Sequence, residues 1–157
     1  MDKLDQPDTI DWKILRELQK EGRLSNVELA SRVGLSPPPT LRRVQALEQA
    51  GFITGYRATL AREKLGYDVE VVALVGLKSQ GQNEIADFER RVTGWPIVRE
   101  CYALQGATDF MLRCVARDLP SLQSFVLDAL SKAPNVESVK TSMVLRKAKD
   151  EPDVPLP

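Results

Sequence analysis

Arg42 and Arg43 stand side by side in a stretch of this 157-residue chain that is predicted to be helical. A guanidinium group is a planar fork of N–H donors, and it can donate two hydrogen bonds at once to O6 and N7 of a guanine. Leu41, Val44 and Leu47 recur at helical spacing and are expected to face a core. The side chains expected to point outward, toward a nucleic acid, are those of Thr40, Arg42, Arg43 and Gln45. Whether the two arginines would read bases or only contact phosphate stays open.

The segment before these arginines supplies elements that would position them. Ser25 precedes Glu28 by three residues, which is the spacing of a capping box at the start of a helix. Gly34 follows that helix and can adopt the positive φ that a turn between crossed helices often needs. A helix, a tight turn and a second helix with a basic outer face form a helix-turn-helix, whose second helix enters the major groove of DNA. An earlier helix is predicted to begin at Thr9 or Asp11 and to end at Gly22.

Three consecutive prolines, at positions 37–39, make the start of the second of these helices unusual. Proline has no amide hydrogen, so the hydroxyl of Ser36 lacks the backbone donors that a helix cap normally accepts. The sequence therefore leaves this hydroxyl free to meet a phosphate. Because a residue before proline is disfavoured in helical conformation, regular helix is predicted to begin near Pro39. Residues 52–58, after Gly51, are predicted to form a short strand or wing.

Charge is distributed unevenly, although the formal net charge of the chain is zero. Between positions 23 and 57 lie five arginines and two glutamates, with no lysine or aspartate, so this stretch carries five minus two, or +3. A local basic patch attracts phosphate, because screening limits charge interactions to about 10 Å at ~0.1 M salt. Further candidates for DNA contact, mostly to phosphate, are Arg23, Ser25, Asn26, Ser36, Pro38, Pro39 and Arg57. Ordinary capping and surface roles explain several of them nearly as well, above all Ser25.

The periodicity of the chain changes after about residue 60. Strands are expected over 69–78, 97–105, 110–116 and 136–146, with helices after the first strand and after Asp118. This order, βαββαβ, is that of a ferredoxin-like fold. We therefore predict an α+β chain, with a winged helix-turn-helix over 1–60, a hinge over 61–68, a ferredoxin-like domain over 69–147 and a disordered, acidic, proline-rich tail over 148–157.

The strand expected over 69–78 carries apolar residues on both of its faces. Val71, Ala73 and Val75 alternate on one face, while Val72 and Leu74 lie on the other. A sheet that is covered by helices on one side alone should leave its second face polar. The second face is therefore expected to be buried against another copy of the chain, in a homodimer or a higher oligomer.

Composition argues for an ordinary cytoplasmic protein. No run approaches the ~18 apolar residues that span a bilayer, and the first residues lack the pattern of a signal peptide. Two cysteines, Cys101 and Cys114, suggest no metal site and no disulfide framework, and no cofactor is expected. If only Ala107 and Thr108 form the turn between two strands, these cysteines lie directly opposite each other, although two free thiols are the favoured expectation.

Several segments resemble the Lrp/AsnC (leucine-responsive, feast/famine) family of bacterial and archaeal transcription regulators. In the first half of the chain these segments are residues 10–19, 22–30, 33–36 and 43–53. The resemblance covers nearly the whole chain. It implies a regulator that binds a pseudo-palindromic operator on double-stranded DNA, assembles as a dimer, tetramer or octamer, and responds to an amino-acid-like effector. Two departures are Gln45-Ala46, where many members carry basic residues, and a proline run that is one residue longer than usual.

Residues 100–102, followed by residues 106–110, resemble the glycine-x-x-aspartate-aromatic loop that this family uses for amino-acid effectors. The resemblance implies an effector site that includes Tyr102, Gly106, Ala107, Thr108, Asp109, Phe110, Thr141 and Ser142. The carboxylate of Asp109 would take the ammonium group of the effector, and loop amides its carboxylate. From the residues alone, an aspartate in a hairpin loop has a purely local structural explanation.

Two other functions fit the same layout. One is a metabolite-binding oligomer that does not bind DNA, and a DNA affinity that is insensitive to salt would favour it. The other is an enzyme that resembles the sirohaem decarboxylases, which share the two-domain plan. The chain has no histidine, the most frequent general acid or base near neutral pH, and this argues against an enzyme. The sequence names neither the operator, the effector, the sign of regulation nor the size of the oligomer.

Overall fold

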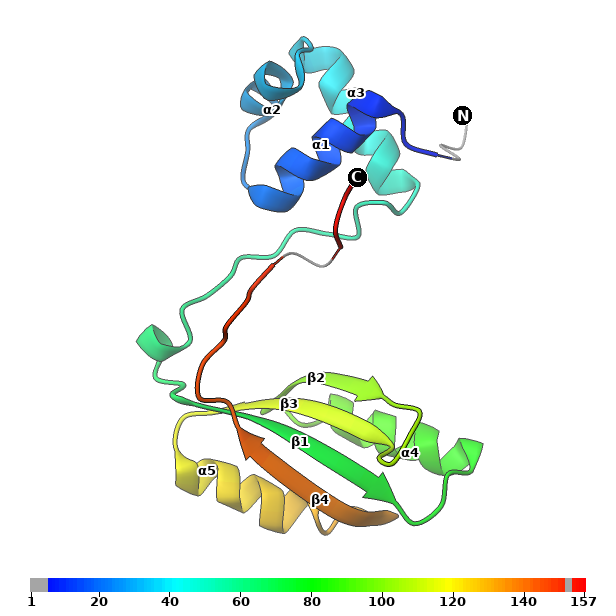
Figure 1. Cartoon of the computed structure of the whole chain (residues 1–157), viewed down its shortest axis with the longest axis vertical. Helices are drawn as coiled ribbons and strands as arrows, with labels where there is room; N and C mark the ends of the chain where they lie inside the picture. The colour runs from blue at the N-terminus through cyan, green and yellow to red at the C-terminus, as the bar shows by residue number, and fades with distance from the viewer. Residues whose placement is uncertain (1–5, 152–153) are drawn as a thin grey trace. The chain divides into compact units, whose positions relative to one another are not determined.

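The computed structural model describes residues 6–151 and 154–157 and divides into two compact units (Figure 1). The N-terminal unit comprises the chain up to Thr59 together with the C-terminal residues from Lys149, and the second unit comprises Leu60–Ala148. The predicted hinge at 61–68 groups with the second unit and contains a short 3-10 helix, η1 (Glu63–Leu65). Residues 1–5 of the first predicted domain and residues 152–153 of the predicted tail lie outside the described residues.

The described part of the N-terminal unit contains the helices α1 (Thr9–Lys20), α2 (Asn26–Val33) and α3 (Pro37–Gln49). Helix α1 begins at Thr9, one of the two predicted starts, and its N-cap is Asp8. The Asp8 carboxylate accepts hydrogen bonds from the N–H groups of Ile10 (2.8 Å) and Asp11 (2.9 Å). In return, the Asp11 carboxylate accepts one from the N–H of Asp8 at 3.1 Å. Two aspartates thus form a capping box whose usual third-position residue is Glu or Gln.

The predicted capping box of α2 is confirmed. Ser25 Oγ accepts from the N–H of Glu28 at 3.3 Å, and the Glu28 carboxylate accepts from the N–H of Ser25 at 2.9 Å. Gly34 ends the helix in the left-handed conformation, with φ 75°.

Helix α3 begins at Pro37, two residues before the predicted start. Its three prolines occupy the first turn, where a helical N–H has no partner within the helix in any case. The first main-chain hydrogen bond runs from the N–H of Thr40 to the carbonyl of Ser36, at 3.3 Å. The prolines therefore cost the helix no hydrogen bond, and this outweighs the local preference of residues that precede proline.

Residues 52–58, predicted to form a short strand or wing, are an extended segment without a strand. None of the described residues of the N-terminal unit forms a strand, so this segment has no neighbour with which to build a ladder. The Tyr56 hydroxyl fastens the segment to α3 by donating to the Glu48 carboxylate at 3.0 Å. Partial burial and this carboxylate raise the pKa of Tyr56 to about 12. Ile53 packs against the core of the unit, which consists of Ile14, Leu29, Val33 and Leu47.

The second unit is a four-stranded antiparallel sheet with helices against one face (Figure 1). In chain order the elements are β1 (Val69–Leu77), α4 (Gln82–Thr93), β2 (Val98–Ala103), β3 (Phe110–Ala116), α5 (Leu119–Ser124), the π-helical continuation η2 (Phe125–Leu130) and β4 (Val136–Met143). The strand order β2-β3-β1-β4 confirms the predicted ferredoxin-like fold. Strands β2 and β4 are both shorter than the sequence predicts.

The core of the second unit lies between the helices and one face of the sheet. Val71, Ala73 and Val75 of β1 are buried there, and Phe88 of α4 lies with its ring centroid 4.7 Å from that of Phe110. The opposite face of the sheet is not covered by these helices. Its apolar side chains are only partly buried, and they are those of Val72, Leu74, Met111 and Val115. No helix among the described residues has the length and apolarity that crossing a lipid bilayer requires.

The C-terminal residues group with the N-terminal unit, where the sequence predicts a disordered tail. The side-chain amide of Gln19 on α1 donates to the carbonyl of Val154 at 2.9 Å, and Leu156 is partly buried. Composition predicts disorder for an acidic, proline-rich segment because such a segment cannot form a core of its own. Here Val154 and Leu156 instead lie against a surface that the helices of the N-terminal unit provide.

Candidate nucleic-acid interface and effector loop

Helix α3 presents one exposed stripe, made of Pro38, Leu41, Arg42 and Gln45. Spacings of three and four residues place these side chains on one side of the helix. Arg42 makes no ion pair with any residue that the structure describes. Leu41 was expected to face the core, yet it is 46% exposed.

Thr40 is buried instead of pointing outward with the arginines. Its hydroxyl donates to the carbonyl of Ser36 at 3.0 Å, so the only polar group of the side chain is satisfied inside the helix. Thr40, Val44 and Leu47 form the inward face of α3. Hydrophobicity alone favours Leu41 over Thr40 for the core. The prediction therefore places Leu41 inward and Thr40 outward, which is the reverse of their positions in the structure.

Arg43 is bound by two carboxylates of α1. Its Nη1 atom lies 2.8 Å from Asp8 Oδ2 and 2.8 Å from Asp11 Oδ1. The Asp11 side chain is only 2% exposed, whereas those of Asp8 and Arg43 are 53% and 35% exposed. These three residues, which we call the Arg43 cluster, connect the start of α1 to the middle of α3.

Hydrogen bonds within the Arg43 cluster favour the charged forms of Asp8 and Arg43. The N–H of Asp11 and the guanidinium of Arg43 lower the pKa of the Asp8 carboxyl. The carboxylates of Asp11 and Asp8 raise the pKa of Arg43. Asp8 and Arg43 are therefore charged at neutral pH, and the hydrogen-bonding capacity of Arg43 is partly occupied within the protein.

Arg32, another arginine of the predicted basic patch, is also paired. Its guanidinium lies 3.2 Å from Glu17 and 2.9 Å from Glu21, two carboxylates that precede the stretch in which the positive charge was counted. Three arginines of this stretch, Arg23, Arg42 and Arg57, are exposed. They make no ion pair with the described residues. The patch is therefore less positive than the count of residues predicts.

The polar candidates for phosphate contact differ in what they already bind. Ser25 Oγ lies 2.6 Å from the Glu28 carboxylate, and this hydroxyl lowers the pKa of Glu28. Asn26 Nδ2 donates to the carbonyl of Pro37 at 2.8 Å and so connects α2 to the start of α3. Ser36 is exposed, and its side chain makes no capping hydrogen bond, as the prolines predict.

The loop between β2 and β3 is longer than the predicted two-residue turn. Ala103 pairs with Phe110, and the N–H of Leu104 donates to the carbonyl of Asp109 at 2.8 Å, which leaves residues 105–108 as the loop. The Asp109 carboxylate accepts from the N–H of Leu77 at 2.6 Å through Oδ2, and the Asp109 N–H donates to the carbonyl of Val75 at 3.0 Å. Asp109 thus joins the start of β3 to the end of β1.

The other candidate effector residues do not converge on a single face of the sheet. Phe110 is 1% exposed and belongs to the core, so it is not accessible to a ligand. Thr141 and Ser142 are consecutive in β4 and therefore point to opposite faces. Ser142 pairs with Val72, which places it on the face away from the helices, and Tyr102 shares that face through its pairing with Met111.

A charged network on this face was missed in the sequence. Arg113 donates to Glu100 at 2.7 Å and to Glu70 at 3.1 Å, and Arg62 lies 3.3 Å from Glu70. Burial would raise the pKa of Glu100, but hydrogen bonds from Tyr102 and Arg113 outweigh it and lower the pKa. In the sequence, Glu70, Glu100 and Arg113 are charged residues that interrupt the apolar alternation, one in each of three strands. They predict contacts with one another only once the order of the strands is known.

The cysteines do not lie opposite each other. Cys101 pairs with Leu112, because the loop is two residues longer than assumed. Cys114 pairs with Val98, because the register also shifts between Val98 and Glu100. Both thiols are free, with Cys101 exposed and Cys114 buried. Burial raises the pKa of Cys114 to about 11.

Models of two known domains match the chain. A winged helix-turn-helix DNA-binding domain matches residues 7–54, and an Lrp/AsnC ligand binding domain matches residues 70–154. The first match covers α1 to α3, and the second covers the sheet with its helices.

Relatives and solved structures agree with both matches. The chain is 51% identical to a leucine-responsive regulatory protein of Rhizobium meliloti, over 91% of this chain and 92% of that one. It is 42% identical to the Bkd operon transcriptional regulator of Pseudomonas aeruginosa, over 88% and 91%. A transcriptional regulator of Neisseria meningitidis, solved as a complex with L-Met, superposes with a TM-score of 0.91 at 38% identity, over 96% of this chain and 97% of that one. With both of its domains matched and its relatives aligned over nearly its full length, the chain belongs to the Lrp/AsnC family of transcription regulators.

Proposed function

We propose that this regulator reads operator DNA with Arg42, and that Arg43 positions the helix that carries it. The contrast between the two side chains carries the proposal. Arg42 is exposed on the outer stripe of α3, while Arg43 is bound between Asp8 and Asp11. Leu41, beside Arg42, offers an apolar contact of the kind that suits a thymine methyl group.

Phosphate contacts would come from Ser36, Arg23 and Arg57. A helix N-terminus usually binds phosphate through free backbone N–H groups. The first turn of α3 consists of prolines and has none to offer, so the exposed Ser36 hydroxyl takes over that role. Ser25 and Asn26 are weaker candidates, because both already make hydrogen bonds within the protein.

Binding to two kinds of duplex tests these roles. Fragments of genomic DNA that bind the protein supply the operator, and a random duplex of equal length supplies the reference. Arg42→Ala is expected to lower the affinity for the operator about 5- to 150-fold, the equivalent of ~1–3 kcal/mol, and to lower the affinity for random DNA less. Arg23→Ala is expected to weaken both by similar factors.

The matched control is Arg99→Ala, an exposed arginine of β2 in the second unit, which should change neither affinity. Equal losses of Arg42→Ala on both duplexes would reduce Arg42 to a phosphate contact. A wild-type affinity that does not fall with rising salt would remove DNA binding altogether and favour a purely metabolite-binding protein.

We further propose that two copies associate through the uncovered face of the sheet. Val72, Leu74, Met111 and Val115 supply its apolar part. Leu74→Asp would place a charge in the centre of such an interface, and sedimentation should show it shifting the protein toward monomers. A wild-type protein that sediments as a monomer at micromolar concentration would refute this association. Assembly beyond the dimer is proposed from family membership alone.

An amino-acid-like effector is proposed for the loop between β2 and β3. The support is the matched ligand binding domain and a similar protein that was solved with L-Met. Asp109 Oδ2 already accepts a hydrogen bond from the N–H of Leu77. Oδ1 accepts none from the described residues, so it can bind an ammonium group. Calorimetry with a panel of amino acids should show binding that Asp109→Asn weakens and that Asp128→Asn, which removes an exposed carboxylate elsewhere, leaves unchanged. Equal binding by all three proteins would exclude Asp109.

We propose that the protein has no catalytic activity and acts where the chromosome lies, in the cytoplasm. The relatives reported above are named as regulators, and DNA is the target that the first domain supports. A shift in tetrapyrrole absorbance on titration with the protein would contradict a purely regulatory role.

A further inference from the structure

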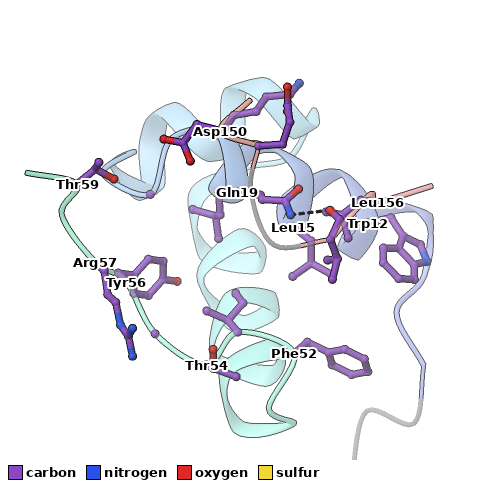
Figure 2. A pocket seen from close by; sticks show the side chains of 17 residues that line it. Trp12, Leu15, Gln19, Phe52, Thr54, Tyr56, Arg57, Thr59, Asp150 and Leu156 are labelled. Atoms are coloured by element: carbon purple, nitrogen blue, oxygen red, sulfur yellow. Dashed lines mark hydrogen bonds between the residues drawn. The ribbon is translucent and has the colours of Figure 1, made fainter. Parts of the chain in front are cut away.

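A cavity of about 780 Å³ lies in the N-terminal unit, between α1 and the extended segment that follows α3 (Figure 2). Trp12, Leu15 and Leu18 of α1 form one part of its lining, and Phe52 and Tyr56 form another. Phe52 is 41% exposed and Tyr56 is 49% exposed. An apolar and aromatic surface of this kind is a binding surface in many soluble proteins.

The last residues of the chain lie against this surface. Val154 and Leu156 line the same cavity, and Figure 2 shows Leu156 beside Trp12 and Leu15. Gln19 Nε2 donates to the carbonyl of Val154 at 2.9 Å. The acidic residues just before, Asp150 and Glu151, line the cavity together with the basic residues Lys20 and Arg57.

The sequence of this segment suits the groove. Residues 154–157 read Val-Pro-Leu-Pro, in which prolines alternate with apolar residues. Proline favours the extended polyproline II conformation, in which carbonyl groups have no internal partners. Proteins recognise such segments with aromatic-lined grooves, because the segment loses little conformational entropy on binding. Here Trp12 supplies a ring beside Leu156, and Gln19 supplies a donor for a carbonyl, while Phe52 and Tyr56 line the rest of the cavity.

We propose that this groove is the docking site of the chain's own segment Val154–Pro157, and that the DNA-binding domain is a discontinuous fold completed by this segment. The segment is tethered, so even weak docking is effective, because a short linker gives an effective concentration of the order of millimolar. Docking connects the DNA-binding domain to the second unit by a second stretch of the chain. The chain passes between the units after Thr59 and again after Ala148, and the second passage follows β4.

Fluorescence of Trp12 tests the docking. In a Trp95→Phe background Trp12 is the only tryptophan, and Trp95 lies among Phe88 and Phe125, where phenylalanine is conservative. Leu156→Asp is expected to shift the emission of Trp12 to longer wavelength and to increase its quenching by acrylamide. Leu145→Asp, at a C-terminal leucine that is 91% exposed, is the matched control and should change neither. Identical spectra for all three proteins would overturn the proposal.

A cross-link decides whose segment occupies the groove. Gln19→Cys and Val154→Cys are combined with Cys101→Ser and Cys114→Ala in the full chain, then oxidised and separated by mass under denaturing, non-reducing conditions. The proposal expects a disulfide within one chain, so the product keeps the mass of a single chain. A product of twice that mass would place the partner's segment in the groove and overturn docking within the chain. Absence of any cross-link would overturn docking itself.

Discussion

Removing the guanidinium of Arg43 would leave a buried charge without its partner. In Arg43→Ala the Asp11 carboxylate, whose side chain is 2% exposed, keeps its hydrogen bond from the N–H of Asp8 and loses the one to its Oδ1 atom. We expect the N-terminal unit to be destabilised, because a buried carboxylate that loses a charged donor also loses the compensation for its desolvation.

The magnitude follows from how deeply each member of the Arg43 cluster is buried. Breaking a fully buried ion pair costs about 3–5 kcal/mol. Arg43 is 35% exposed, so water enters the vacated space and reduces this cost. The pair with Asp8, which is 53% exposed, adds about 0–1 kcal/mol at most. We therefore expect the free energy of unfolding to fall by ~2 kcal/mol.

Urea unfolding followed by Trp12 fluorescence in the Trp95→Phe background measures this loss. Arg42→Ala is the control on the same helix, and it should change the free energy of unfolding by less than about 0.5 kcal/mol, because an exposed side chain that pairs with none of the described residues contributes little. A double-mutant cycle of Arg43→Ala with Asp11→Ala should return a coupling energy of about 1–2 kcal/mol.

One pattern of results would refute a positioning role for Arg43. It is a change in stability below about 0.5 kcal/mol in Arg43→Ala, together with a larger loss of operator affinity than in Arg42→Ala. Arg43 would then leave its carboxylates in the complex and read the DNA itself.

Three further measurements follow from the structure. Thr40→Val should lower the free energy of unfolding by ~1 kcal/mol in urea titrations, because it removes the bond to the Ser36 carbonyl, and should leave operator affinity unchanged. The folded-state pKa of Asp8 is lowered, so its contribution to stability is complete above the usual value near 3.9 and is lost as the pH falls through the lowered pKa. Thermal melts between about pH 5 and pH 2 should therefore fall less steeply for Asp8→Asn, and parallel curves would contradict this. Alkylation at neutral pH should label Cys101 alone in the native protein, because Cys114 is buried with a pKa of about 11; early labelling of Cys114 on intact mass analysis would contradict its burial.

The elements of this fold that rest on local patterns could be predicted from the sequence. The capping box of Ser25 and Glu28, the glycine turn at Gly34 and strand β3 over 110–116 all match. Each depends on residues that lie within a few positions of one another, or on a regular alternation of apolar residues. The order of the strands followed from the order of these elements.

The features that the sequence did not reveal depend on residues that are far apart in the chain. Arg43 lies 35 residues from Asp8, and Arg113 lies 43 residues from Glu70. Periodicity assigns Arg43 to an outer surface, and it names no partner for either arginine. The predicted register of β2 and β3 is wrong for a related reason. It assumes a short loop from the positions of Gly106 and Asp109, whereas the main-chain pairing gives a longer one.

The discontinuous N-terminal unit has a consequence for how the protein is made. Translation delivers its three helices first and residue 154 only after the whole second unit, roughly 5–20 s later at about 5–20 residues per second. Throughout that interval the side of α1 around Trp12 is not covered by residues 154–157. Termination or proteolysis before residue 154 would leave this surface uncovered, so by our proposal the DNA-binding domain is complete only in a chain that includes Val154–Pro157.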